Sequence, residues 1–122
     1  MEEYQVKVYS DRTEWYQNNL LHRLDGPAIE RSNGDKYWYQ NGERHRLDGP
    51  AIEWADGDKS WFQNGQVHRL DGPAVERADG DVKYWIEGKE LTEQEFIKRT
   101  QTKEVTMAEL EQLFGYPVKI KK

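Results

Sequence analysis

The stretch His45-Arg46-Leu47-Asp48-Gly49-Pro50-Ala51 decides the fold, because the same seven residues also begin at His22 and at His68. Both intervals are 23 residues long. Each copy is followed by an aliphatic residue and a glutamate, and turn dipeptides and tryptophans recur at the same interval. Three copies in a chain of 122 residues predict a repeat architecture in which each unit packs on its neighbours.

Each unit is predicted to hold two short strands and two tight turns. Asn-Gly and Asp-Gly favour two-residue type I′ turns, in which both residues have positive φ. With Asp56-Gly57 at such a turn, Ile52 lies opposite Trp61; with Asn64-Gly65 at the next, Trp61 lies opposite His68. This register predicts one core face, made of Trp15, Trp38, Trp61, Trp85, His22, His45, His68, Ile29, Ile52 and Val75, joined by Leu24, Leu47 and Leu70.

The other face is predicted to be more polar. It is expected to hold the alanines, glutamates and second aromatics of the units, and the arginines that follow the histidines, which we expect to pair with carboxylates: Ala28, Ala51, Ala74, Glu30, Glu53, Glu76, Tyr16, Tyr39, Phe62, Arg23, Arg46 and Arg69. Trp85 follows Trp61 by 24 residues, so the pattern also predicts one inserted residue and a β-bulge near Asp81-Val82.

Both flanks are predicted to cap the repeats. Tyr4, Val6 and Val8 alternate with polar residues as in an opening strand. Thr92 begins a capping box for a helix that ends near Thr100. A second capping box at residues 106–109 predicts another helix, and residues 116–122 a final strand. The predicted fold is mainly β with a small α tail: an antiparallel β-hairpin meander of 23-residue repeats over residues 1–88, and a helix–helix–strand tail over 89–122 that packs on it as one domain.

Composition favours a thin, aromatic domain. Leu, Ile, Val and Phe make up about 19% of the chain and mean hydropathy is −1.11, yet 5 Trp and 7 Tyr add apolar area. No apolar run is long enough for a membrane helix, and residues 1–4 lack the pattern of a secretion signal. With no cysteine, the chain is expected in a reducing cytoplasm. A net charge of −5 argues against nucleic acid as a partner.

The unit that runs from Trp38-Tyr39-Gln40-Asn41-Gly42 to His45–Ala51 resembles the variant MORN repeats of bacteriophage and giant-virus proteins. The resemblance covers about residues 13–88, and the tail is similar to a segment common in small phage proteins. It implies a β-hairpin meander that serves as an interaction scaffold, with no shared catalytic residues.

The histidines are the residues that most invite a chemical role. His22, His45 and His68 each precede an aspartate by three residues, but equal hairpin units place successive histidines about 10 Å apart. Ligands of one metal ion must lie about 4 Å or less from each other. We therefore expect each histidine to pack on a tryptophan and bond the aspartate or a backbone carbonyl, and we predict no metal, no cofactor and no enzyme.

A protein-binding role follows from the resemblance and from the ordered display of aromatic and charged residues. The candidate contact residues are Tyr16, Tyr39, Phe62, Arg46, Arg69, Glu53 and Glu76. The predicted partner is a bacterial host protein, which the chain would inhibit or sequester. By analogy with phage proteins, this host protein would be a component of a bacterial defence system. Three alternatives stay open: a sponge for a nucleotide signal, a structural or assembly protein that forms homo-oligomers, and mimicry of nucleic acid by the acidic turns.

Overall fold

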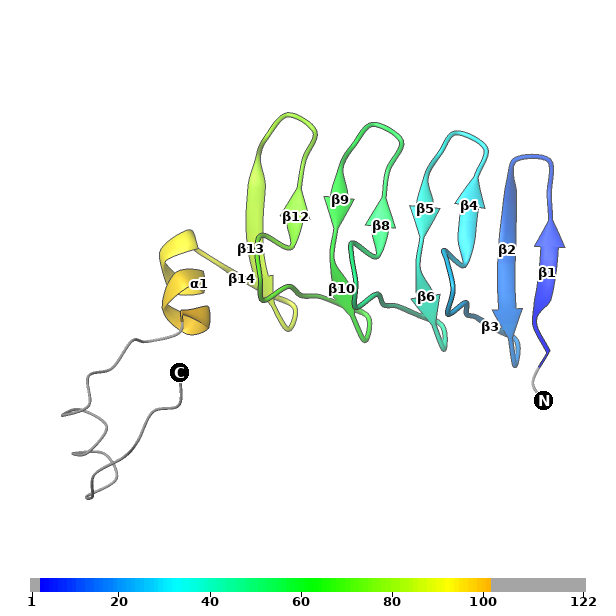
Figure 1. Ribbon diagram of the computed structural model, residues 1–122, viewed down its shortest axis with the longest axis horizontal. Helices are drawn as coiled ribbons and strands as arrows, with labels where there is room; N and C mark the ends of the chain where they lie inside the picture. The colour runs from blue at the N-terminus through cyan, green and yellow to red at the C-terminus, as the bar shows by residue number, and fades with distance from the viewer. Residues whose placement is uncertain (1–2, 102–122) are drawn as a thin grey trace, which may run out of the picture.

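The computed structural model describes residues 3–101, which form a mainly antiparallel β meander with one short helix (Figure 1). Hairpins stand side by side in chain order and the helix lies at the far end of the row. The second helix and the final strand predicted from the sequence lie outside the described residues. The bounds of the elements are β1 Gln5–Val8, β2 Arg12–Gln17, β3 Leu20–Leu21, β4 Ile29–Arg31, β5 Lys36–Tyr37, β6 Tyr39–Gln40, β7 Glu43–Arg44, β8 Ile52–Glu53, β9 Lys59–Ser60, β10 Phe62–Gln63, β11 Gln66–Val67, β12 Val75–Glu76, β13 Val82–Ile86, β14 Lys89–Leu91 and α1 Glu93–Thr100.

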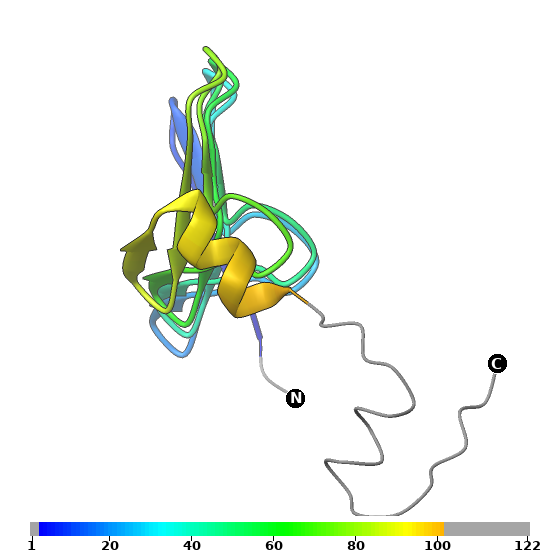
Figure 2. The same ribbon diagram turned by 90° about the vertical axis from the view of Figure 1, so that its left-hand side faces the viewer.

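One long sheet connects the hairpins, in the order β1-β2-β4-β5-β8-β9-β12-β13-β14, with β3 beside β2. β6–β7 and β10–β11 form two further small hairpins at the lower edge in Figure 1. Figure 2 shows the row end-on: the upper part is a single thin layer, and the lower part bulges where loops leave the sheet. Each hairpin therefore contacts only its neighbours in the row.

The lower turns have the predicted geometry. Asn41 and Gly42 both have positive φ, 51° and 80°, as a type I′ turn requires. The same pattern occurs at Asn18-Asn19, Asn64-Gly65 and Glu87-Gly88. The N–H of His45 donates to the carbonyl of Trp38 at 3.1 Å, so histidine and tryptophan lie opposite each other as predicted.

The upper turns differ from the prediction. The N–H of Trp54 donates to the carbonyl of Asp58 and the N–H of Gly57 to the carbonyl of Trp54, both at 3.0 Å. Among these residues only Gly57 has positive φ, 101°, so the loop holds three residues and ends in a glycine bulge. The extra loop residue shifts the register by one, and Ile52 pairs with Ser60 instead of Trp61.

This shift divides the predicted core between two faces, because a slip of one residue reverses every side chain. The row that contains Ile29, Ile52 and Val75 lies on the face opposite the tryptophans. The tryptophan row instead includes the alanines that were predicted on the polar face. Trp38 N–H donates to the carbonyl of Ala51 at 2.7 Å, and Ala28, Ala51 and Ala74 are completely buried.

The predicted insertion and β-bulge near Asp81-Val82 are absent from the described hairpin. Val75 pairs with Lys83 in the register that Ile52 and Ser60 have one unit of 23 residues earlier. Tyr84 therefore occupies the position of Trp61. The carbonyl of Trp85 accepts the N–H of Arg69, as those of Phe62 and Tyr39 do from Arg46 and Arg23. Trp85 belongs to the second aromatic row, and the prediction that it joins Trp15, Trp38 and Trp61 is wrong.

The predicted first helix is confirmed as α1, with the capping box in place. The hydroxyl of Thr92 accepts the N–H of Glu95 at 3.1 Å, and the Glu95 carboxylate accepts the N–H of Thr92 at 3.0 Å. These bonds lower the pKa of Glu95. Phe96 is buried with Ile86 and Leu91, and its ring lies 4.7 Å from that of Tyr84. This small apolar cluster fixes the helix against the last hairpin.

Candidate functional site

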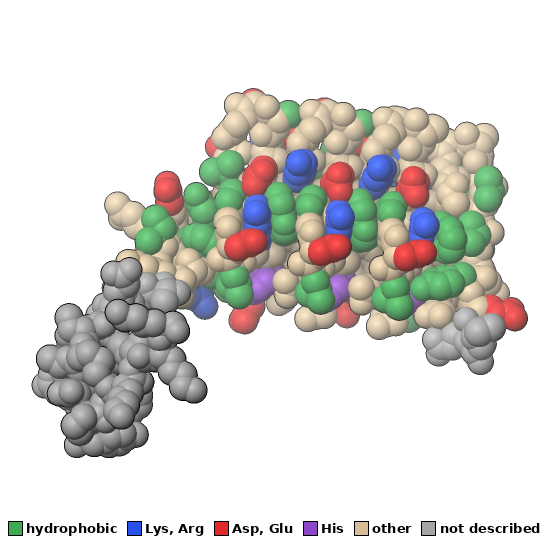
Figure 3. Space-filling view, in the orientation of Figure 1, with side chains coloured by type: hydrophobic (Ala, Val, Ile, Leu, Met, Phe, Trp, Pro, Cys, Tyr) green, Lys and Arg blue, Asp and Glu red, His purple; other side chains and the backbone are tan. Residues whose placement is uncertain are grey.

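Three equivalent loops lie side by side on one face of the row, at residues 23–27, 46–50 and 69–73. Each has the sequence Arg-Leu-Asp-Gly-Pro. Figure 3 shows this surface, which we call the loop face, with its basic, acidic and apolar side chains in repeated rows.

The arginine of each loop is locked in place. The guanidinium of Arg46 lies 3.9 Å from the ring centroid of Trp38. Its Nε donates to Asp48 Oδ1 at 3.0 Å, and its Nη1 donates to the carbonyl of Pro50 at 3.0 Å and to Glu53 Oε2 at 2.7 Å. Arg23 and Arg69 make the same contacts, each 3.9 Å from its tryptophan. The expected pairing with carboxylates is confirmed.

The charges of the loop face balance locally. The hydrogen bond from Arg46 lowers the pKa of Asp48, and the same cause lowers the pKa of Asp25 and of Asp71. Above the loops, glutamates and lysines alternate across the strands, since Glu53 pairs with both Lys36 and Lys59. The aspartates are well exposed, 86% for the Asp48 side chain, so carboxylates are the outermost charges of each loop.

The histidines connect one unit to the next. Nδ1 of His45 accepts the backbone N–H of Asn64 at 3.0 Å, and His22 and His68 accept from Asn41 and Glu87 at the same distance. The expected bond to an aspartate or a carbonyl is therefore wrong, because the ring acts as an acceptor from a turn amide. In its neutral form the ring then carries its proton on Nε2. Within residues 3–101, no group of three His, Asp or Glu side chains is placed to hold a metal ion.

Two hollows lie between the three loops. The first, of about 630 Å³, lies between loops 23–27 and 46–50 and is lined by Trp38, Gln40 and His45. The second, of about 470 Å³, lies between loops 46–50 and 69–73 and is lined by Trp61, Gln63 and His68. Arginine and histidine line the same hollows, so the expectation that they occupy opposite faces is wrong. The chain turns sharply after each histidine and brings the arginine back over the tryptophan.

The leucines of the loops project into solvent. Leu24, Leu47 and Leu70 are 68%, 75% and 56% exposed, so their predicted place in the core is wrong. Each follows the hydrogen-bonded histidine and arginine in a loop, where the alternation of a strand no longer applies. They form a row of apolar side chains on the loop face (Figure 3).

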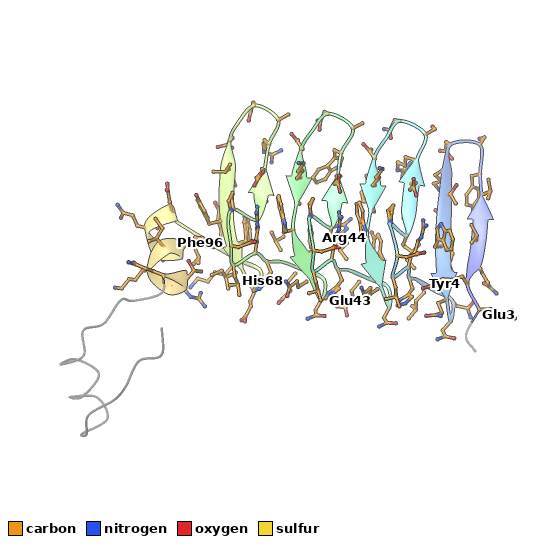
Figure 4. The ribbon with its side chains drawn as sticks, viewed as in Figure 1. Glu3, Tyr4, Glu43, Arg44, His68 and Phe96 are labelled. Carbon is orange, nitrogen blue, oxygen red and sulfur yellow. The ribbon has the colours of Figure 1, made fainter. Side chains whose placement is uncertain are left out.

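Tyr4 covers the end of this row (Figure 4). Its ring lies 5.6 Å from that of Trp15, edge to face, and is stacked 6.1 Å from the ring of His22. Its hydroxyl accepts the backbone N–H of Leu24 at 3.4 Å. Trp15 and His22 are the counterparts of the residues that line the two hollows, so Tyr4 occupies in the first unit the kind of space that stays open in the next two.

The structure divides the predicted contact residues between two surfaces. Arg46, Arg69, Glu53 and Glu76 belong to the loop face. Tyr16, Tyr39 and Phe62 lie on the opposite face, each half-buried in a lower hairpin. There the guanidinium of Arg44 lies 5.5 Å from the ring of Phe62 and donates to the hydroxyl of Tyr39 (Figure 4). The sequence prediction did not place the three leucines on the surface, and their place directly before Asp-Gly-Pro was the signal that they sit in a loop.

Comparison of the chain with family models, with curated proteins and with solved structures finds no match. Among the described residues, no helix has the length and apolar character needed to cross a bilayer.

Proposed function

We propose that this chain is a non-enzymatic protein-binding module and that the loop face is its contact surface. The observation that carries the proposal is the row of exposed leucines, Leu24, Leu47 and Leu70, on loops that are held together by the hydrogen bonds of their arginines. An exposed apolar row bordered by charged residues is typical of protein interfaces. It replaces the mixed set of contact residues expected from the sequence.

The anchoring of the loops supports this role. Binding is weakened when side chains and loops must become ordered, by about 0.5–1.5 kcal/mol for each immobilised side chain. On the loop face that order already exists, because Arg46 ties its loop to Trp38, Asp48 and Glu53. The loop backbone that carries each leucine is therefore positioned before a partner arrives.

The same bonds disfavour a nucleotide as the ligand. Arg23, Arg46 and Arg69 each donate to two carboxylates and to a backbone carbonyl. A phosphate would have to replace these bonds beside exposed aspartates that repel it. A protein surface with apolar and basic groups fits better.

The resemblance of residues 13–88 to MORN-type repeats of phages supports a partner in the bacterial cytoplasm. We propose that the chain inhibits or sequesters a bacterial host protein. This part of the proposal rests on analogy and is tested together with the surface.

The test is affinity capture from bacterial lysate with three tagged forms: the natural chain, Leu47→Glu/Leu70→Glu, and Ile97→Glu as the matched control. Ile97 is 48% exposed on α1 and lines neither of the two hollows. We expect one stoichiometric protein with the natural chain and with Ile97→Glu, and its loss with the double variant. Circular dichroism verifies that all three are folded. No stoichiometric protein, or one that the double variant retains, contradicts the proposal.

A further inference from the structure

The two hollows of the loop face are open versions of a space that the chain itself fills in its first unit. There, Tyr4 contacts Trp15 and His22 and accepts the N–H of Leu24. The counterparts of that N–H belong to Leu47 and Leu70, and within residues 3–101 neither has a hydrogen-bond acceptor. Each open hollow therefore offers an indole, an imidazole and a free backbone donor.

The spacing of the hollows limits what can fill both. Successive units are two strands apart in the sheet, which is about 9.4–9.8 Å. A polyproline II helix returns to the same side every three residues, after about 9.3 Å. In an extended strand, side chains point to the same side every two residues, after about 6.8 Å. In an α-helix, they do so every seven residues, after about 10.5 Å. The polyproline II period fits the row best.

The chemistry of the hollows fits the same conformation. A polyproline II backbone makes no internal hydrogen bonds, so its carbonyls need donors. The loop face supplies the N–H groups of Leu47 and Leu70, the side chains of Gln40 and Gln63, and the Nε2–H of the histidines whose Nδ1 is already bonded. Grooves lined by aromatic rings with such donors are the usual sites for proline-rich segments.

We infer that the loop face binds a proline-rich segment of its protein partner in the polyproline II conformation, with an aromatic ring at every third residue seated in successive hollows. The inference rests on the proposed function and names the chemistry of the partner. The exposed carboxylates of Asp25, Asp48 and Asp71 favour basic residues beside the rings.

The test uses two synthetic peptides of identical composition, both flanked by arginine. One is (Tyr-Pro-Pro)4, with tyrosine at every third residue; in the other, the tyrosines are spaced by two and four residues. Binding to the full chain is followed by two-dimensional NMR of the backbone amides and the tryptophan side chains. We expect the regular peptide to shift the amides of Leu47 and Leu70 and the indoles of Trp38 and Trp61.

We expect the regular peptide to bind at least about fivefold more tightly than the irregular one, because only the regular peptide places tyrosines three residues apart, in both hollows at once. Leu47→Glu should weaken binding by a similar factor and Ile97→Glu should leave it unchanged. Equal binding of the two peptides, or no shifts at millimolar peptide, overturns the inference. Shifts of the same amides on concentrating the chain alone would show that a second copy fills the face, and would also overturn it.

The two proposals fail separately. If lysate capture gives a partner that depends on Leu47 and Leu70 while neither peptide binds, the protein-binding role stands and the polyproline II ligand is wrong. If the regular peptide binds but no protein is captured, the face recognises the predicted chemistry and the proposed bacterial partner is wrong.

Discussion

The side chain of Arg46 makes a cation–π contact and donates hydrogen bonds to two carboxylates and a backbone carbonyl. A lysine at this position keeps the charge but loses the planar fork that reaches these partners together. We expect Arg46→Lys to lower the free energy of unfolding by about 1–2 kcal/mol, measured by urea denaturation. Arg77→Lys is the matched control, because Arg77 is 51% exposed in a single ion pair of 3.6 Å; a loss there as large as at Arg46 would contradict this view.

The aspartates of the loops should make the fold sensitive to acid. Hydrogen bonds from arginine lower the pKa of Asp25, Asp48 and Asp71 in the folded chain. A carboxyl group whose pKa is lower in the folded than in the unfolded chain stabilises the fold. This contribution is complete at pH values above the pKa of the unfolded chain, and it is lost as the pH falls through the pKa of the folded chain. We expect Asp48→Asn to lose less stability than the natural chain between pH 5 and about pH 2, by urea titrations at each pH. If the free energy of unfolding falls equally with pH in the two proteins, Asp48 does not contribute to the acid sensitivity of the fold.

At the scale of elements, the two kinds of turn have different sequence requirements. Asn41 has φ of 51°, in the left-handed region that costs most residues about 1–2 kcal/mol. We expect Asn41→Ala to destabilise the chain by about 1 kcal/mol in thermal or urea unfolding. Asn41→Gly should leave stability nearly unchanged, since glycine adopts this conformation freely. An alanine variant as stable as the glycine variant would contradict the type I′ assignment in solution.

The Asn-Gly turns were predictable, but the register of the Asp-Gly turns was not. Asp-Gly fits both a two-residue turn and a three-residue loop that ends in a glycine bulge. Contacts beyond the dipeptide stabilise the longer loop: the Asp56 carboxylate accepts the N–H of Asp58, and the Asp58 carboxylate accepts the N–H of Ala78 in the following unit. A bond to a residue 20 positions away is not visible in local sequence.

The error in the candidate site has the same origin. Once the register was shifted by one residue, Ala51 moved to the face of the tryptophans and Ile52 to the opposite face, and both side chains are buried there. The arginines and glutamates were recognised as surface residues because their charge identifies them in either register. Leu47 was assigned to the core by extending strand alternation into residues that belong to a loop.

At the scale of the whole molecule, the row of hairpins should tolerate the loss of one complete unit. Deletion of residues 46–68 joins His45 to Arg69, so the junction again reads His-Arg-Leu-Asp-Gly-Pro-Ala as in each natural unit. We expect a shorter chain that still unfolds cooperatively, with a smaller urea m-value because less surface is exposed. Deletion of residues 46–57 removes about half a unit and should prevent cooperative folding. The reverse result, or equal behaviour of the two deletions, contradicts the modular packing.

The thinness of the sheet affects how temperature acts on this protein. No large side chain among residues 3–101 is fully buried, and the upper part of the row is a single thin layer (Figure 2). The heat-capacity change of unfolding comes chiefly from newly hydrated apolar surface, and a chain of 122 residues ordinarily gives about 1.5–1.8 kcal/mol/K. Calorimetry should find a value clearly below this range. The stability curve would then be broad and flat, so that chilling the protein weakens it far less than it weakens a globule of equal length.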